Sequence, residues 1–436
     1  RISIFRRWCA VSSILIKSGR ILGGVAQDIL IKDQKIIEIA DSIEVIADQT
    51  IDAKDCVVLP GLVDLHTHLR EPGKEGSETI ASGSLAAARG GFTAVSAMAN
   101  TTPVADNAAI VEQVWTIGRE VGLVDVFPIG AVTKGLAGKE LSDLGSMSQS
   151  RAKVGVFSDD GHCVSDSLLM RRALEYVKQF DGVVAQHAQD PALTQGAQMN
   201  EGIISAELGL KGWPRVAEES IIARDILLAE YVGARLHICH VTTAGGVELI
   251  RWAKSRGISV TAEVTPHHLL LTDEEVRSYD PVYKVNPPLR TNEDVMALRA
   301  GLADGTIDIV ATDHAPHPQE DKECEWQAAA FGMLGLETAL AIVNTTMVQQ
   351  GLMDWSALAE RMSVTPAKIG RYQDHGLEIK VGALANLAVI NPTTEVLVDR
   401  DLVASRSKNT PFHSMTLKGA VVATLFKGVL THKVGA

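Results

Sequence analysis

The chain has 436 residues, of which 46% are hydrophobic and 22% are charged, a composition typical of a globular protein and not of a disordered one. Its 41 Lys and Arg residues against 53 Asp and Glu residues give a net charge of −12, which argues against nucleic acid or an anionic membrane as the main partner. No apolar run reaches the roughly 18 residues of a membrane span, and the five cysteines are scattered without a CxxC pair, so we expect a soluble cytoplasmic protein.

The first residues predict a small β-layer after an irregular start. Residues 1–16 carry arginines ahead of a short apolar stretch, which Lys17 interrupts and which is too short for a convincing signal peptide. The apolar and β-branched stretches that follow are separated by turn residues, as expected for short strands. These stretches are 13–17, 28–31 and 35–39.

From about residue 57 the pattern changes to strands that alternate with helices. The nearly continuous apolar run 57–65 is typical of a strand buried on both faces. Further strands are predicted at 92–99, 124–132, 152–158, 182–187, 235–240, 259–264 and 307–312. Helices are predicted at 106–121, 165–180 (with Ser165 as its cap), 215–231, 245–256, 292–303 and 335–350. Eight strands with helices between them predict an α/β fold of the (β/α)8 TIM-barrel type.

Strand patterns return near the C-terminus, at 388–390, 395–398 and 420–424. We expect both ends of the chain to pair into one small β-sandwich domain beside the barrel. The predicted division gives residues 1–57 and 377–436 to the β-sandwich domain and residues 58–376 to a metal-dependent catalytic barrel.

Two histidines directly after the first barrel strand carry the strongest chemical signal. In an extended strand, residues two apart face the same way, so His66 and His68 point toward one place. Two imidazoles that converge at a strand end suit a divalent metal such as zinc. A pair of surface histidines fits poorly after so apolar a strand.

Four further segments place His or Asp where a barrel strand should end. They contain Asp159 and Asp160, His187, His240, and Asp313. Taken singly, an Asp-Asp-Gly turn or a lone structural histidine is an adequate explanation for each. Together they supply the ligands of a hydrolytic site with one or two metals, in which the metal lowers the pKa of a water toward neutrality. No Walker A motif, GxSxG elbow or well-placed GxGxxG motif points to other chemistry.

With these residues identified, the chain resembles the amidohydrolase superfamily and, within it, the class I dihydroorotases. The resemblance extends from about residue 13 to the end of the chain. Its most specific segments are 60–73 (PGLVDLHTHLREPG), 284–290 (KVNPPLR), 312–317 (TDHAPH) and 407–412 (SKNTPF). It implies reversible cyclisation of N-carbamoyl-L-aspartate to L-dihydroorotate by a metal-activated hydroxide, in pyrimidine biosynthesis.

The resemblance also implies roles for individual residues. One Zn²⁺ would be bound by His66, His68 and Asp313, and a second, where present, by His187 and His240. Asp160 would bridge the two, with Asp159 or a carboxylated Lys153 as alternatives. Asp313 would also be the catalytic proton shuttle. The implied substrate-binding residues are Arg70, Asn100, Asn286, His317, Phe331 and Gly332.

Two other functions remain open at this level. A hydantoinase, dihydropyrimidinase or allantoinase would keep the fold and the metal, but Arg70 beside the histidine pair and the lack of a clear carboxylated-lysine segment favour a dihydroorotase. An inactive dihydroorotase-like partner of aspartate transcarbamoylase would have lost metal ligands, whereas every candidate is present here. We expect a homodimer that acts on a small molecule, with association to aspartate transcarbamoylase left open.

Overall fold

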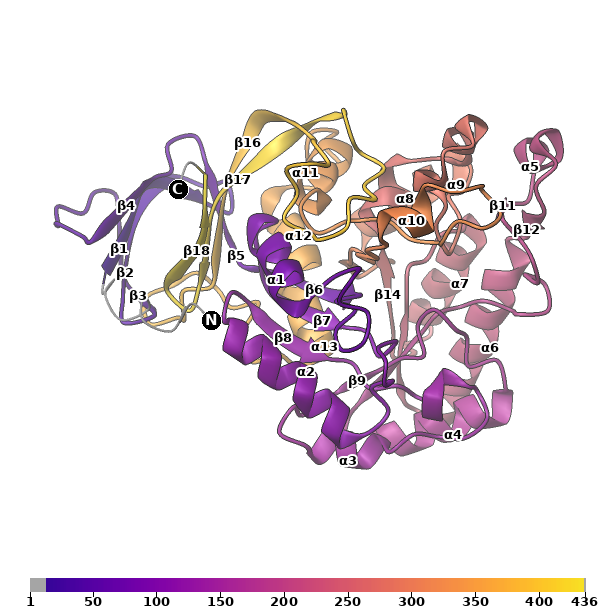
Figure 1. The fold of residues 1–436 in the computed structure, drawn as a ribbon. Helices are drawn as coiled ribbons and strands as arrows, with labels where there is room; N and C mark the ends of the chain where they lie inside the picture. The colour runs from indigo at the N-terminus through magenta and orange to yellow at the C-terminus, as the bar shows by residue number, and fades with distance from the viewer. Residues whose placement is uncertain (1–12, 435–436) are drawn as a thin grey trace.

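The computed structural model describes residues 13–434, so residues 1–12 of the irregular start, with Cys9, lie outside that range. Eight parallel strands form a barrel with helices around it (Figure 1). The strands are β6 (Leu62–Thr67), β7 (Phe92–Ala97), β8 (Asp125–Pro128), β9 (Val156–Phe157), β10 (Val183–Gln186), β13 (Arg235–Ile238), β14 (Val260–Val264) and β15 (Ile309–Val310). The predicted barrel is confirmed.

The barrel strands form two ladders that are joined at two narrow seams. One ladder runs β6-β7-β8 and the other β9-β10-β13-β14-β15. A single parallel bridge between Gly130 and Phe157 joins β8 to β9, and another between Thr67 and His314 joins β6 to the end of β15. At the second seam the Asp64 side chain accepts a hydrogen bond from the Thr312 amide at 3.1 Å. A side-chain carboxylate thus takes the place of a ladder bond.

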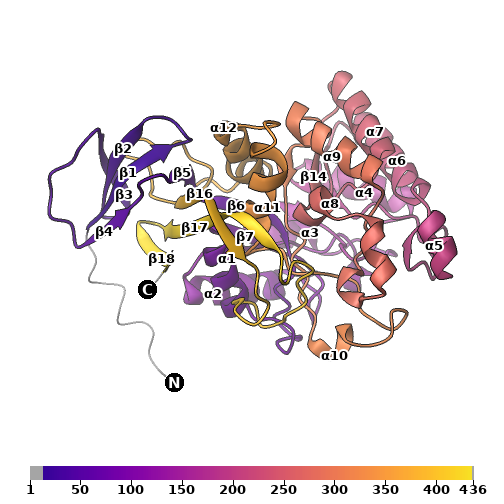
Figure 2. The same cartoon turned by 90° about the horizontal axis from the view of Figure 1, so that it is seen from above.

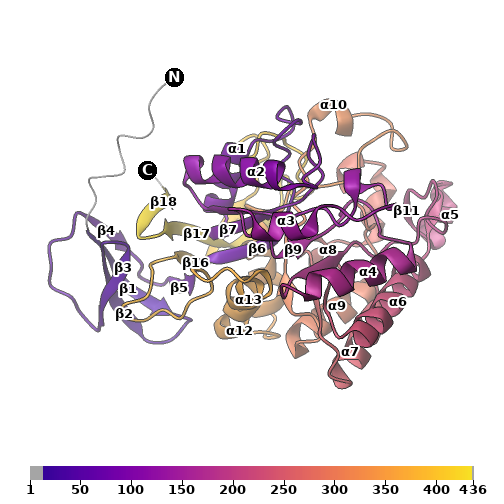
Figure 3. The same ribbon diagram turned by 90° about the horizontal axis from the view of Figure 1, so that it is seen from below.

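Helices cover the outside of the barrel and pack their apolar faces on it (Figure 3). The α-helices of residues 13–434 are α1 (Ile80–Arg89), α2 (Ala108–Val121), α3 (Leu144–Gln149), α4 (Ser167–Lys178), α5 (Ile203–Leu208), α6 (Val216–Val232), α7 (Ala244–Ser255), α8 (Pro266–Leu270), α9 (Asn292–Asp304), α10 (Gln319–Lys322), α11 (Ala339–Val343), α12 (Trp355–Ala359) and α13 (Thr365–Gly370). Helix α5 packs in a separate small cluster, and α10 has no apolar side chain. Within residues 13–434, no helix has the length and apolar character needed to cross a bilayer.

Two helical segments differ from expectation. Helix α1 was not predicted, because its sequence contains glycine and two serines; Gly83 is required where the helix packs on Leu69, as a Cβ there would lie 2.6 Å from the Leu69 side chain. The helix predicted at 335–350 starts later than expected and changes from an α-helix to a π-helix along its length. It begins as α11 and continues as the wider turns of a π-helix over Asn344–Val348.

The strands at the two ends of the described chain form one eight-stranded sheet. Its order is β18-β17-β16-β5-β1-β2-β3, with β4 paired to β1. The strands are β1 (Ser13–Ile21), β2 (Ala26–Lys32), β3 (Lys35–Ala40), β4 (Gln49–Asp52), β5 (Val57–Pro60), β16 (Leu387–Leu397), β17 (Thr416–Phe426) and β18 (Val429–Lys433). Apolar side chains from both halves, such as Ile29 and Leu425, share one core, so the sheet folds on itself as a sandwich beside the barrel (Figure 2).

The N-terminus of α4 tests how a single residue sets a helix boundary. Asp166, and not the predicted Ser165, is its cap, because the Asp166 carboxylate accepts a hydrogen bond from the Leu169 amide at 2.7 Å. We expect Asp166→Ala to lower the free energy of unfolding by about 1 kcal/mol. Ser165→Ala should leave it unchanged within about 0.5 kcal/mol. Urea denaturation of the two variants and the parent chain measures both values, and equal effects would contradict the assignment.

Candidate metal centre

Six buried side chains meet at the carboxyl ends of five barrel strands. His66 lies in β6 and His68 directly after it, and the other four follow the ends of β9, β10, β13 and β15. These four are Asp160, His187, His240 and Asp313. The carboxyl ends of parallel barrel strands open on one rim, so residues distant in sequence converge there.

The first group contains two imidazoles and two carboxylates. His68 Nε2 lies 3.1 Å from Asp313 Oδ1 and 3.3 Å from Asp160 Oδ2. His66 Nε2 lies 3.5 Å and 3.3 Å from the same two atoms. The four side chains each offer one ligand atom, and these atoms all lie within 4.8 Å of one another.

The second group uses the other oxygen of the same aspartate. His187 Nδ1 and His240 Nε2 lie 3.1 Å and 3.0 Å from Asp160 Oδ1, and 3.0 Å from one another. Asp160 therefore presents one carboxylate oxygen to each group. That arrangement is what a carboxylate shared by two metal ions requires.

The two alternative bridging residues lie elsewhere. Asp159 turns away from the histidines: its Oδ1 accepts hydrogen bonds from the Val132 and Thr133 amides at 2.8 Å and 2.9 Å, and its Oδ2 binds the Thr133 hydroxyl. Lys153 is exposed in the turn before β9. The geometry favours Asp160 over both.

The donor atoms fit a divalent metal ion. His66 Nε2 is buried and makes no hydrogen bond within the described chain, although it points at two carboxylates. Imidazole nitrogens and carboxylate oxygens are the ligands that zinc and similar ions take in hydrolytic sites. The protein therefore has a His and Asp cluster whose donor atoms could hold a metal ion.

Backbone strain is concentrated at this rim. His240 and Asp313 adopt positive φ angles of 29° and 47°, and Arg70 one of 63°. Residues with a Cβ rarely adopt this conformation, and where they do, the surrounding structure holds them in it, commonly at functional sites.

Glu263 on β14 is a member of the site that the sequence analysis missed. Its Oε1 lies 2.6 Å from His66 Nδ1 and accepts the His240 amide at 3.1 Å, and its Oε2 lies 3.0 Å from His237 Nε2. A carboxylate on the far nitrogen of a ligand histidine fixes the orientation of the ring. The available signal was a glutamate inside an otherwise apolar strand.

Arg70 and His317 form one wall beside the first group. We call it the cationic wall because it carries the positive charge of Arg70. Arg70 Nε donates to the Pro316 carbonyl at 3.1 Å, and Nη2 lies 3.3 Å from His317 Nε2. Burial lowers the pKa of Arg70 to about 10, so the guanidinium stays protonated at neutral pH. Burial and the charge of Arg70 lower the pKa of His317 to about 3, which keeps the imidazole neutral.

Asn100 contacts a candidate ligand histidine directly, and Asn286 is linked to another through Gln189. Asn100 Oδ1 lies 3.0 Å from His68 Nδ1. Asn286 Nδ2 donates to Gln189 Oε1 at 3.2 Å, and that oxygen lies 2.7 Å from His187 Nε2. Asn286 Oδ1 is buried without a hydrogen-bond partner in the described chain, which leaves it free for a ligand. Gln189 is a second member that no sequence signal indicated.

Phe331 and Gly332 complete the wall with their backbones. The Phe331 carbonyl lies 2.8 Å from His317 Nε2, and the Gly332 amide donates to Lys284 at 2.9 Å. Gly332 has a φ of 140°, and a Cβ on it would lie 2.8 Å from the Ala315 methyl and 2.9 Å from His317 Nε2. Only glycine fits at this position.

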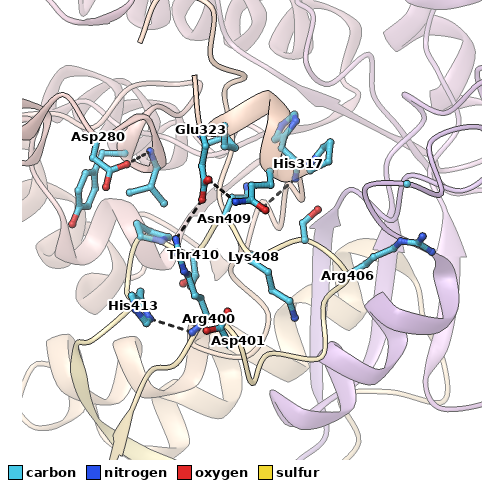
Figure 4. A pocket seen from close by; sticks show the side chains of 18 residues that line it. Asp280, His317, Glu323, Arg400, Asp401, Arg406, Lys408, Asn409, Thr410 and His413 are labelled. Atoms are coloured by element: carbon cyan, nitrogen blue, oxygen red, sulfur yellow. Dashed lines mark hydrogen bonds and ion pairs between the residues drawn. The ribbon is translucent and has the colours of Figure 1, made fainter. Parts of the chain in front are cut away.

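A cavity of about 550 Å³ has His317 and Asn409 in its wall (Figure 4). It is lined by residues from 280–283, 317–323 and 400–413, and none of the six clustered side chains reaches it. Arg400 Nη1 lies 3.7 Å from Glu323 Oε1 across it. The cavity thus lies next to the cationic wall and outside the metal cluster.

Known proteins similar to this chain were found by sequence and by structure. A family model described as "Dihydro-orotase-like" matches residues 55–245. The dihydroorotase of Streptomyces coelicolor is 62% identical over 421 residues, which are 97% of this chain and 98% of that protein. The dihydroorotase of Mycobacterium tuberculosis is 55% identical over 426 residues, 97% and 99% of the two chains.

Among solved structures, the L-hydantoinase (dihydropyrimidinase) of Arthrobacter aurescens is similar with a TM-score of 0.86 at 28% identity, covering 98% of this chain and 97% of that one. A D-hydantoinase with a TM-score of 0.84 is 22% identical over 97% and 95% of the chains, and shows the shared fold alone. High identity over nearly the whole length separates the dihydroorotases from these structural neighbours. The chain belongs to the dihydroorotase family.

Proposed function

We propose that this protein is a dihydroorotase, which opens the ring of L-dihydroorotate to N-carbamoyl-L-aspartate and, in the opposite direction, closes the ring in pyrimidine biosynthesis. The observation that carries the proposal is the position of Arg70 beside the metal cluster. A planar guanidinium is well suited to a carboxylate, which dihydroorotate has and simple cyclic ureides lack.

In the proposed site, His66, His68 and Asp313 would hold one ion, His187 and His240 would hold a second, and Asp160 would be shared by both. We propose Zn²⁺ as the ion, because the donor set of imidazoles and carboxylates suits it. A bound ion of this kind polarises the scissile carbonyl and lowers the pKa of a water toward neutrality.

Asp313 is placed to move the proton. Burial raises the pKa of Asp313, but the charge of His66 and the hydrogen bond with His68 outweigh it and lower that pKa to about 2. The carboxylate is therefore ionised and accepts a proton from the attacking water. It delivers that proton to the departing ring nitrogen, and in ring closure the proton moves the other way.

Arg70 and the groups around it bind the substrate. The buried guanidinium binds the carboxylate, and its positive charge draws an anion into a protein whose net charge is −12. Asn100 and Asn286 offer amide groups to the ring from two sides. We also propose that the enzyme is homodimeric and cytoplasmic and that it can associate with aspartate transcarbamoylase.

A substrate panel tests the function. Purified protein with its metal content measured is assayed with dihydroorotate, hydantoin, 5,6-dihydrouracil and allantoin. We expect turnover of dihydroorotate and at least 100-fold lower kcat/KM for the rings without a carboxylate, because a buried cation is then left unpaired. Turnover of hydantoin or allantoin without dihydroorotate would assign the chain to its structural neighbours' activity. Inactivity with full metal occupancy would favour an inactive scaffold.

A further inference from the structure

Asn409 is buried at the point where the C-terminal segment crosses the cationic wall. Its side chain is 6% exposed and makes three hydrogen bonds to the backbone of two separate segments. Oδ1 accepts from the His317 amide at 3.1 Å, and Nδ2 donates to the Ala315 carbonyl at 3.0 Å and the Gly332 carbonyl at 3.2 Å. One amide therefore ties segment 315–317 to Gly332.

The chemistry of these contacts fixes the orientation of the Asn409 amide. Its oxygen faces an N–H group and its nitrogen faces two carbonyl oxygens, so a flipped amide would place like groups against each other at all three contacts. Only a side chain with one acceptor and two donors in this planar arrangement satisfies the three backbone groups. Aspartate has the same shape but, when ionised, no donor.

The segment that carries Asn409 is itself anchored to the barrel. The Ser407 hydroxyl donates to the Ser77 carbonyl at 2.7 Å, and the Arg406 amide donates to Glu78 at 3.0 Å. The Leu334 amide donates to the Asn409 carbonyl at 3.1 Å. Asn409 thus links the cationic wall to a segment that is itself hydrogen-bonded to the barrel.

The groups that Asn409 holds in turn orient Arg70. Arg70 Nε donates to the Pro316 carbonyl, and Nη2 lies beside the His317 ring. Both partners belong to the segment whose two flanking backbone groups, the Ala315 carbonyl and the His317 amide, bind Asn409. Within residues 13–434, the Asn409 side chain makes no hydrogen bond to a residue of the metal cluster.

We propose that Asn409 is a positioning residue that sets the geometry of the carboxylate-binding half of the site, through Ala315, His317 and Gly332, and leaves the metal-binding half unchanged. The inference rests on the proposed function, in which Arg70 binds the substrate carboxylate. It assigns a specificity role to the segment 407–412, which lies outside the barrel strands.

The test compares Asn409→Asp and Asn409→Ala with the control Ser407→Ala, which removes an anchor of the same segment without touching the wall. For each protein we measure KM and kcat with dihydroorotate, the dissociation constant of orotate (a planar ring with the same carboxylate) and metal per chain. We expect both Asn409 variants to raise KM and the orotate dissociation constant by about tenfold or more, the scale of one hydrogen bond to a charged group. We expect kcat to change by less than about threefold, and metal content to match the parent.

Several outcomes overturn the inference. An unchanged KM and orotate affinity in both Asn409 variants would do so, as would a loss of kcat together with metal, which would show a general structural role. An equal rise of KM in Ser407→Ala would assign the effect to the segment and not to the amide. Failure of the proposed function is separate, because it would appear as no turnover of dihydroorotate by the parent protein.

Discussion

Asp313→Asn is expected to lower kcat for dihydroorotate by about 10²–10⁴-fold, the range for loss of a general acid–base group. The amide keeps the size of the side chain and its contact with His68, but it cannot accept a proton at neutral pH. Because Asp313 is also a proposed ligand, the assay is run with metal at saturation and with metal content measured in parallel.

Asp308→Asn is the matched control for this experiment. Asp308 lies just before β15 and binds Lys254 Nζ at 2.7 Å, away from the metal cluster. We expect it to keep kcat within about threefold of the parent, as for a substitution that loses no transition-state contact. An Asp313→Asn variant with comparable activity would assign the proton transfer to another group.

Asp160→Asn is expected to release metal from both halves of the site and to lower kcat/KM by about 10³-fold or more. The reason is that an amide has one oxygen and one NH₂ group, so it cannot present an oxygen to both halves. Loss of an ion that contributes several kcal/mol to the transition state corresponds to an effect of this size. Metal per chain and turnover are measured on the same sample.

Asp159→Asn separates the two neighbouring aspartates. The Asp159 carboxylate accepts hydrogen bonds from Val132 and Thr133, so we expect this variant to keep its metal. Loss of metal in Asp159→Asn with retention in Asp160→Asn would reverse the assignment. Retention of metal in both variants would favour Lys153 as the bridging residue.

The barrel and the positions of the clustered residues were predictable because the chemistry follows buried strands directly. An apolar run that ends in His or Asp predicts a buried strand, and it also predicts that the His or Asp lies on the barrel rim, as at His66 and Asp313. The residues by themselves did not decide between Asp159 and Asp160, and the prediction of Asp160 came from the family resemblance. Both stand in one turn after a two-residue strand, and only the path of the loop decides which carboxylate faces the histidines.

Glu263 and Asn409 were given no role in the site for a common physical reason. Each acts on a partner distant in sequence, such as His66 across 197 residues for Glu263 and His317 across 92 residues for Asn409. A single sequence contains no periodicity that reports such pairs. Helix α1 was missed because the tight packing of Gly83 on Leu69, a tertiary contact, overrides low helix propensity.

The metal cluster has residues on both sides of the narrow seam between β6 and β15. The backbone bridge there is a single pair, Thr67 with His314, yet His66 and His68 lie on one side of it and Asp313 on the other. An ion bound by the three residues, as proposed, would join the first barrel strand to the last. The free energy of metal binding is therefore also free energy that opposes local opening of the barrel. Metal affinity and protection of this seam against hydrogen exchange are two measures of the same linkage.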